Sequence, residues 1–207
     1  MQFISVAETV AKKSNGIFEA LDMGDVAVDY FKEKCEELSR ETLIKLRDKR
    51  AGNEGKSLLH IAARGGVLPA VLYLVNIGHP IDLFDSSLTR KTALMDAIES
   101  KKLEIVIVLV ESGADLSKTD INNENAFHYA ARSGSSRIIK WMTKASNLQP
   151  SEIQEYAGAT NIRLKFPEDL AENYLTQEIL TNYRTAGKHE SSMRNPERPR
   201  TAQRQVA

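Results

Sequence analysis

Side chains that commonly perform catalysis or bind metals are few in this chain and lie far apart. None of the four histidines is paired with another at the spacing that two metal ligands on one helix require. Asp96 and Glu99 are three residues apart, so a helix would place both carboxylates on one face. A carboxylate pair acts as acid and base only in a pocket that shifts its pKa values, and a solvated helix face is the simpler interpretation.

The single cysteine and the glycine turns also lack the surroundings that chemistry needs. Cys35 is the only cysteine, which excludes an internal disulfide, favours a reducing compartment and argues against a structural zinc site. We interpret it as a small packing residue and not as a nucleophile. The turn at residues 64–67 lacks the G-x-x-x-x-G-K pattern of a phosphate-binding loop, and no Gly-x-Ser-x-Gly elbow occurs. The sequence therefore predicts a protein that is not an enzyme, with no catalytic residue, no cofactor and no metal site.

Charge and hydropathy restrict the partners. Residues 184–207 hold six basic and two acidic side chains, a net charge of +4, and because the whole chain is neutral the first 183 residues carry −4. Such a body lacks the clustered Lys and Arg of a nucleic-acid binder, so no nucleic-acid partner is expected. The longest apolar run, residues 105–110, is far shorter than the ~20 residues that cross a bilayer, and the N-terminus has no signal-peptide core. We expect no membrane insertion and a cytoplasmic location, with the nucleus as an alternative.

Three segments of the chain repeat one another. His60, Met95 and His128 occupy one matching position in them, 35 and 33 residues apart. Each segment has the pattern of a short helix, a turn and a second helix with a broad apolar face. Because one repeat alone cannot bury these faces, the units are expected to stack into a solenoid.

The residues of the three segments resemble the ankyrin-repeat family. The T-P-L-H-x-A-A motif of that family appears as residues 57–63 (SLLHIAA), 92–98 (TALMDAI) and 125–131 (NAFHYAA). The resemblance is strong from residue 55 to residue 141. It implies an all-α ankyrin-repeat solenoid of about five stacked helix–turn–helix units with finger loops between them. It also implies that the motif histidines hydrogen-bond the backbone of neighbouring finger loops.

Individual positions fit this architecture physically. The small side chains of Ala62, Ala97 and Ala130 would let neighbouring first helices approach closely. A glycine after the first helix permits the positive φ that ends it, and the glycine of the outer two segments is replaced by Lys101 in the middle one. An insertion of two residues falls at about residues 83–89, inside a finger loop.

Both ends depart from the repeat and are predicted to cap it. The predicted units are a divergent N-terminal capping repeat with a helical insertion (14–53), three ankyrin repeats (54–145), an insertion with a C-terminal capping repeat (146–186) and a disordered basic tail (187–207). The N-terminal insertion is predicted to be a helix near residues 42–46, and the C-terminal one a helix capped by Ser151. The tail is polar and carries two prolines, which favours disorder over docking on the acidic body, on acidic lipid or on RNA.

The resemblance also implies where a partner would lie, on the finger loops and the exposed, concave side of the first helices. Carried over residue by residue, it predicts a partner-binding set of Arg50, Glu54, Ile61, Arg64, Arg90, Asp96, Glu99, Asn122, Tyr129 and Arg132. The expected surface has an acidic centre at Asp96 and Glu99, flanked by arginines, with Ile61 and Tyr129 as apolar anchors. Leu88 and Ile121 are further loop residues on this surface.

The predicted function is that of a protein–protein interaction module, an adaptor or scaffold that holds another protein and is monomeric by itself. The alternative is a regulatory ankyrin domain, seen as a fragment or short isoform of a larger enzyme or channel, because the sequence ends in a low-complexity basic stretch. A narrower alternative is an aromatic cage for methylated lysine at Trp141. The apolar neighbours of Trp141 favour core packing instead.

Overall fold

The computed structural model describes residues 15–48, 55–144 and 148–193, and this part of the chain is helical without strands. A helix over residues 15–22 comes first. The elements after it are η1 (Gly24–Ala27), α2 (Val28–Glu36), α3 (Arg40–Lys45), α4 (Leu58–Gly65), α5 (Leu68–Asn76), α6 (Ala93–Glu99), α7 (Leu103–Glu111), α8 (Ala126–Arg132), α9 (Ser136–Lys144), α10 (Pro150–Gly158), η2 (Pro167–Leu170) and α11 (Tyr174–Met193). Of the helices in the described ranges, none combines the length and apolar character needed to cross a lipid bilayer.

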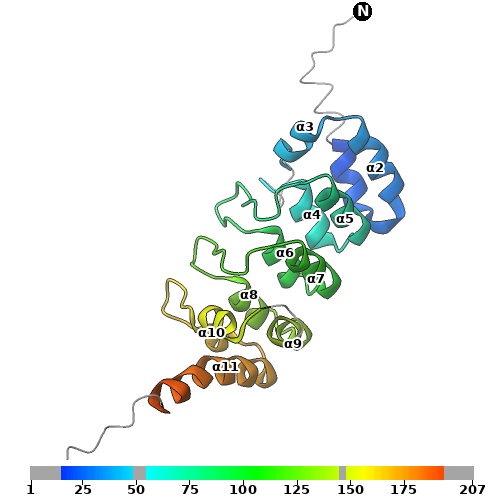
Figure 1. Cartoon of the computed structure of the whole chain (residues 1–207). Helices are drawn as coiled ribbons and strands as arrows, with labels where there is room; N and C mark the ends of the chain where they lie inside the picture. The colour runs from blue at the N-terminus through cyan, green and yellow to red at the C-terminus, as the bar shows by residue number, and fades with distance from the viewer. Residues whose placement is uncertain (1–14, 49–54, 145–147, 194–207) are drawn as a thin grey trace, which may run out of the picture.

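The helices pair into units that stack in one direction (Figure 1). The first helices α4, α6 and α8 pack on one another in a row, and the second helices α5, α7 and α9 form a parallel row. At the ends, α2 packs on α5, η2 on α8 and α11 on α9. With the helix over residues 15–22 and η2 counted as first helices, the described residues form five units, which confirms the predicted all-α solenoid.

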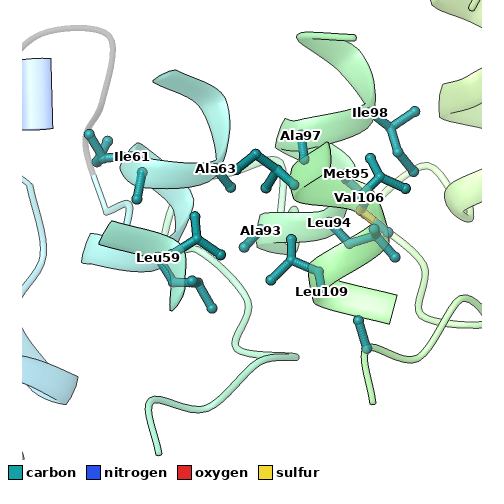
Figure 2. Close-up of a cluster of buried hydrophobic side chains, with 14 of the residues drawn as sticks. Leu59, Ile61, Ala63, Ala93, Leu94, Met95, Ala97, Ile98, Val106 and Leu109 are labelled. Carbon is teal, nitrogen blue, oxygen red and sulfur yellow. The ribbon is translucent and has the colours of Figure 1, made fainter. Parts of the chain in front are cut away.

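Small side chains explain why the first helices stack so closely. Ala62, Ala97 and Ala130 are fully buried, as the repeat pattern predicts. Larger apolar residues fill the space between the two rows, and Figure 2 shows Leu59, Leu94 and their neighbours meeting between adjacent units. Burial of this continuous apolar surface stabilises the array, because no unit has a core of its own.

The turns after the first helices need left-handed backbone. Gly66 and Gly134 have φ values of 83° and 65°, which a glycine adopts without steric cost. In the middle unit Lys101 takes the same position with φ 58°. The predicted glycine role is confirmed, and the middle unit retains a residue that is disfavoured there.

The two ends differ in detail from the sequence prediction. The predicted helix near residues 42–46 is present as α3, but α10 begins at Pro150 with Gln149 as its N-cap residue, so the assignment of Ser151 as the cap is wrong. The disordered tail is predicted to start at residue 187, but α11 continues past that point to Met193. The helix can continue because no proline occurs between its start and Pro196. Residues 194–207 lie outside the described part of the chain.

Candidate functional site

Four loops precede the first helices and share one construction. They are the finger loops, residues 48–56, 85–91, 120–124 and 161–165, of which 49–54 lie outside the described residues. The N–H of the first residue donates to the carbonyl oxygen of the last in Asp48–Lys56 (2.8 Å), Asp85–Lys91 (2.8 Å), Asp120–Glu124 (3.1 Å) and Asn161–Lys165 (3.0 Å). The residue before the last has positive φ in each: Gly55, Arg90, Asn123 and Leu164. An Asp or Asn at the start stabilises such a turn, because its side chain accepts backbone N–H groups within the loop.

Backbone hydrogen bonds join each finger loop to the next. Ser86 N–H donates to Gly55 O (2.9 Å), Ile121 N–H to Thr89 O (3.1 Å) and Ile162 N–H to Asn122 O (2.9 Å). The loops project together from the side of the stack opposite the second helices (Figure 1). Their relative positions are therefore fixed by the main chain and do not depend on a partner.

The motif histidines also hold the finger loops in place. His60 Nε2 lies 2.9 Å from Lys91 O, and His128 Nε2 lies 3.3 Å from Lys165 O. Burial lowers the pKa of His60 to about 4, so the ring is neutral at pH 7. Its Nε2–H then donates to Lys91 O while Nδ1 accepts from the Ser57 hydroxyl (2.7 Å). The predicted loop-bonding role of both histidines is confirmed.

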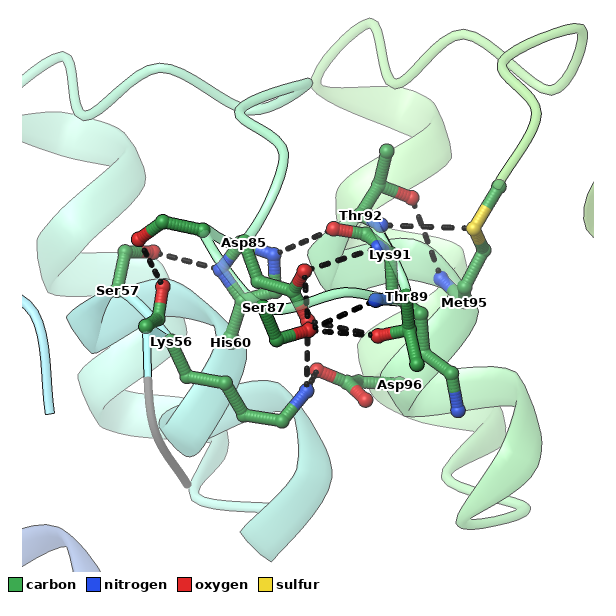
Figure 3. A network of polar contacts seen from close by, with 12 residues as sticks. Lys56, Ser57, His60, Asp85, Ser87, Thr89, Lys91, Thr92, Met95 and Asp96 are labelled. Atoms are coloured by element: carbon green, nitrogen blue, oxygen red, sulfur yellow. Dashed lines mark hydrogen bonds and ion pairs between the residues drawn. The ribbon is translucent and has the colours of Figure 1, made fainter. Parts of the chain in front are cut away.

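Asp96 is buried in an ion cluster, defined here as Lys56, Asp85 and Asp96 (Figure 3). The Lys56 ammonium lies 2.5 Å from an Asp96 carboxylate oxygen and 3.4 Å from one of Asp85. Burial raises the pKa of Asp96, although the nearby Lys56 opposes this shift. The expectation of an exposed acidic centre is thus wrong for Asp96, because the neighbouring finger loops cover it. Glu99 is exposed, but it pairs with Lys91 at 2.8 Å.

The two expected apolar anchors are also buried. Ile61 is 5% exposed and packs in the core between units (Figure 2). Tyr129 is 2% exposed, and its hydroxyl donates to an Asp120 carboxylate oxygen at 2.9 Å. Its ring centre lies 5.2 Å from the Lys91 ammonium and 4.8 Å from the Arg132 guanidinium. Neither side chain presents a surface to a partner, so their assignment as anchors is wrong.

The remaining predicted residues divide by location. Arg64, Arg90, Asn122 and Arg132 are exposed, as is Glu99. Arg90 lies over the Phe84 ring at 4.8 Å, and Arg132 pairs with Glu124. Partner binding by these five stays a prediction. Arg50 and Glu54 lie outside the described residues.

Large apolar side chains are exposed at the tips of the last three finger loops. We call Leu88, Ile121, Ile162 and Leu164 the apolar tip row; their exposed fractions are 89%, 56%, 64% and 80%. Apolar groups gathered on neighbouring loops mark interaction sites more often than scattered ones do. Ile162 and Leu164 were missed by sequence reasoning because the repeat motif does not extend over their loop. The Asp or Asn that starts each of the four finger loops is a signal in the sequence that could have located this last loop.

The cysteine of the described chain is poorly placed for nucleophilic chemistry. Cys35 is 1% exposed, and burial raises the pKa of its thiol to about 12, which disfavours the reactive thiolate. In the described ranges, no group of three or more His, Cys, Asp or Glu side chains is placed to hold a metal ion. Trp141 packs partly buried against the core.

Comparison with known proteins finds the same repeat. The family model of ankyrin repeats (three copies) matches residues 26–120. Inversin from Homo sapiens is 29% identical over 106 residues, covering 51% of this chain and 10% of that protein. B-cell lymphoma 3 protein from Homo sapiens is 30% identical over 121 residues, covering 56% of this chain and 26% of that protein. The chain thus spans about a tenth to a quarter of these relatives. The family match begins in the N-terminal unit and ends before α8, whose motif and packing nevertheless repeat those of α4 and α6.

Proposed function

Because the chain belongs to the ankyrin-repeat family, we propose that it is a protein-binding module that holds a partner protein across its finger loops and the exposed side of its first helices. Ankyrin repeats are generally protein–protein interaction modules, and the apolar tip row is the observation that carries the proposal. Its four side chains stand on three successive loops, so one partner can contact all of them at once.

The fixed positions of the finger loops support this role. Hydrogen bonds within and between loops hold the backbone of the tip row before any partner arrives. Binding to such a surface costs less conformational entropy than binding to loops that must first be ordered. The exposed apolar groups lose contact with water when a partner covers them, which contributes favourably to affinity.

The proposed module acts by binding alone, as an adaptor or scaffold without an enzymatic step. The buried thiol of Cys35 and the lack of a second cysteine suit a reducing compartment, so we place it in the cytoplasm, with the nucleus as an alternative.

The test is affinity capture from native cell extract with matched variants, read by mass spectrometry. Leu88→Ser/Leu164→Ser removes two apolar side chains from the tip row. Met23→Ser/Val26→Ser removes two exposed apolar side chains from the N-terminal unit and serves as the control. We expect a stoichiometric partner that the first variant loses and the control keeps. No stoichiometric partner, or one that survives the first variant, contradicts the proposal.

A second candidate is the regulatory ankyrin part of a larger enzyme or channel. It is favoured by the small share of each relative that the chain covers. An immunoblot of native tissue distinguishes the two candidates. A band much heavier than 23.1 kDa, the mass of this chain, supports the larger protein, and a single band at 23.1 kDa supports the self-contained module.

A further inference from the structure

The last finger loop carries positive charge that no contact within the described chain uses. Arg163 and Lys165 are exposed on either side of Leu164, and neither forms an ion pair with a described residue. They line a pocket of about 340 Å³ between the last two finger loops. Arg132, from α8, lines the same pocket and is the third cation there.

The acidic residue of this pocket is already satisfied. Glu124 is 5% exposed, and one carboxylate oxygen accepts a hydrogen bond from Arg132 Nη1. The other oxygen accepts from Asn161 Nδ2 at 3.0 Å. Glu124 therefore offsets the charge of Arg132 and leaves Arg163 and Lys165 as an excess of two positive charges at the rim.

The rim is held rigidly. The Asn161 side-chain oxygen accepts the backbone N–H groups of Arg163 (2.9 Å) and Lys165 (3.1 Å). Asn123 Nδ2 donates to Thr160 O at 2.7 Å, which ties this loop to the preceding one. The two free cations thus project from a backbone that is organised before binding.

Cationic and apolar side chains alternate along this loop. Ile162 and Leu164 belong to the apolar tip row, Arg163 and Lys165 are the free cations, and Ile121 of the preceding loop is also exposed. The complement of such a surface is a chain segment in which apolar and acidic residues alternate. A nucleic acid would satisfy the cations but would leave the apolar tips facing water, and the first 183 residues carry a net negative charge that repels it.

We propose that this surface takes an acidic segment of the partner protein, with a carboxylate in the pocket beside Arg163 and Lys165 and apolar side chains on Ile121, Ile162 and Leu164. The inference rests on the proposed function and specifies the chemistry of the partner. A guanidinium and an ammonium together bind a carboxylate through charge-assisted hydrogen bonds, which are stronger than those between neutral groups.

The test is a fluorescence-anisotropy titration of the whole chain with labelled peptides. The main probe repeats Glu-Leu-Ser four times; two control peptides repeat Lys-Leu-Ser and Glu-Ser-Ser, and a single-stranded thymidine oligomer reports phosphate binding. We expect the main probe to bind at least about tenfold more tightly than each control. Arg163→Glu/Lys165→Glu is expected to weaken it about tenfold. Arg137→Glu/Lys140→Glu, the same charge change on exposed residues of α9, is expected to leave the affinity within about twofold.

The inference is overturned if the main probe does not bind, or if either control peptide or the oligomer binds equally well. It is also overturned if Arg163→Glu/Lys165→Glu leaves the affinity for the main probe unchanged. The capture experiment separates this failure from failure of the proposed function. If a captured partner is lost with Leu88→Ser/Leu164→Ser but kept with Arg163→Glu/Lys165→Glu, the module binds a partner, but the proposal of an acidic segment is wrong. If both variants keep it, both proposals fail.

Discussion

The finger loops beside α6 and the last finger loop use the same position in opposite ways. Lys56, Lys91 and Lys165 each end a finger loop. Lys56 reaches Asp96 on α6, the first helix of the next unit. Lys91 lies over the ring of Tyr129 on α8, which is again the first helix of the next unit. In the described residues, no further unit follows Lys165. A charge at this position is therefore used inside the solenoid when another unit follows, and stays available to a partner where the array ends.

The largest expected effect comes from breaking the ion cluster beside α6. Lys56→Met removes the cation that compensates two buried carboxylates, and we expect the free energy of unfolding to fall by about 3–5 kcal/mol. Urea unfolding followed by circular dichroism measures this change, with Lys140→Met on exposed α9 as the matched control. A loss no larger than that of the control would mean that the ion cluster is solvated. Lys56 would then not differ from Lys165 in its use inside the solenoid.

Much of the fold was predictable from the sequence, because the repeat is carried by local positions. His60 and His128, the small alanines and the turn glycines do what the motif predicts. The failures at the predicted partner-binding surface share one cause, which is burial under the finger loops. Asp96 and Tyr129 lie on the predicted helix face, but finger loops cover them. Lys56 of the preceding loop reaches Asp96, and Tyr129 lies under Lys91 of the preceding loop and donates to Asp120 of its own loop. Ile162 and Leu164 were missed for a different reason, because their loop lies outside the repeat motif.

The pH dependence of stability tests whether His60 fastens neighbouring loops as a neutral ring. Its native pKa of about 4 is below the usual value of 6.5. As pH falls through 6.5 the unfolded chain binds a proton that the native state does not, so stability decreases until about pH 4. Between pH 7 and pH 5 this costs about 2 kcal/mol.

A matched variant isolates this effect. His60→Met copies Met95, the residue at the matching position of the middle unit, and should lower the difference in unfolding free energy between pH 7 and pH 5 by about 2 kcal/mol. His79, whose pKa is also lowered to about 4 chiefly by its own burial, is present in both proteins, so its contribution enters both sides of the comparison. An unchanged pH dependence in the variant would show that His60 is protonated in the folded state as readily as in the unfolded one.

A smaller effect is expected at the turn after α6. Lys101 has φ 58° where the flanking units have glycine, and its ion pair with Glu172 is long and exposed. Lys101→Gly should raise the free energy of unfolding by about 0.5 kcal/mol, because relief of left-handed strain exceeds the added entropy of the unfolded chain. Thermal unfolding measures it against Lys118→Gly, a half-buried lysine that also forms an ion pair with an aspartate but has no positive φ. A lower melting temperature than wild type would contradict the strain.

The smallest expected effect on stability is at the cations of the last finger loop. Arg163→Ala/Lys165→Ala should change the free energy of unfolding by less than about 0.5 kcal/mol, since these cations have no partner within the described chain. Urea unfolding is again the measurement. A loss of several kcal/mol would show that the two side chains stabilise the last unit and are not reserved for binding.

Hydrogen–deuterium exchange of the whole chain, with and without the Glu-Leu-Ser peptide, tests the central contrast most directly. The account predicts slower exchange on peptide binding at residues 120–124 and 161–165, and little change at residues 85–99. Protection centred on residues 85–99, or no protection anywhere, would contradict it.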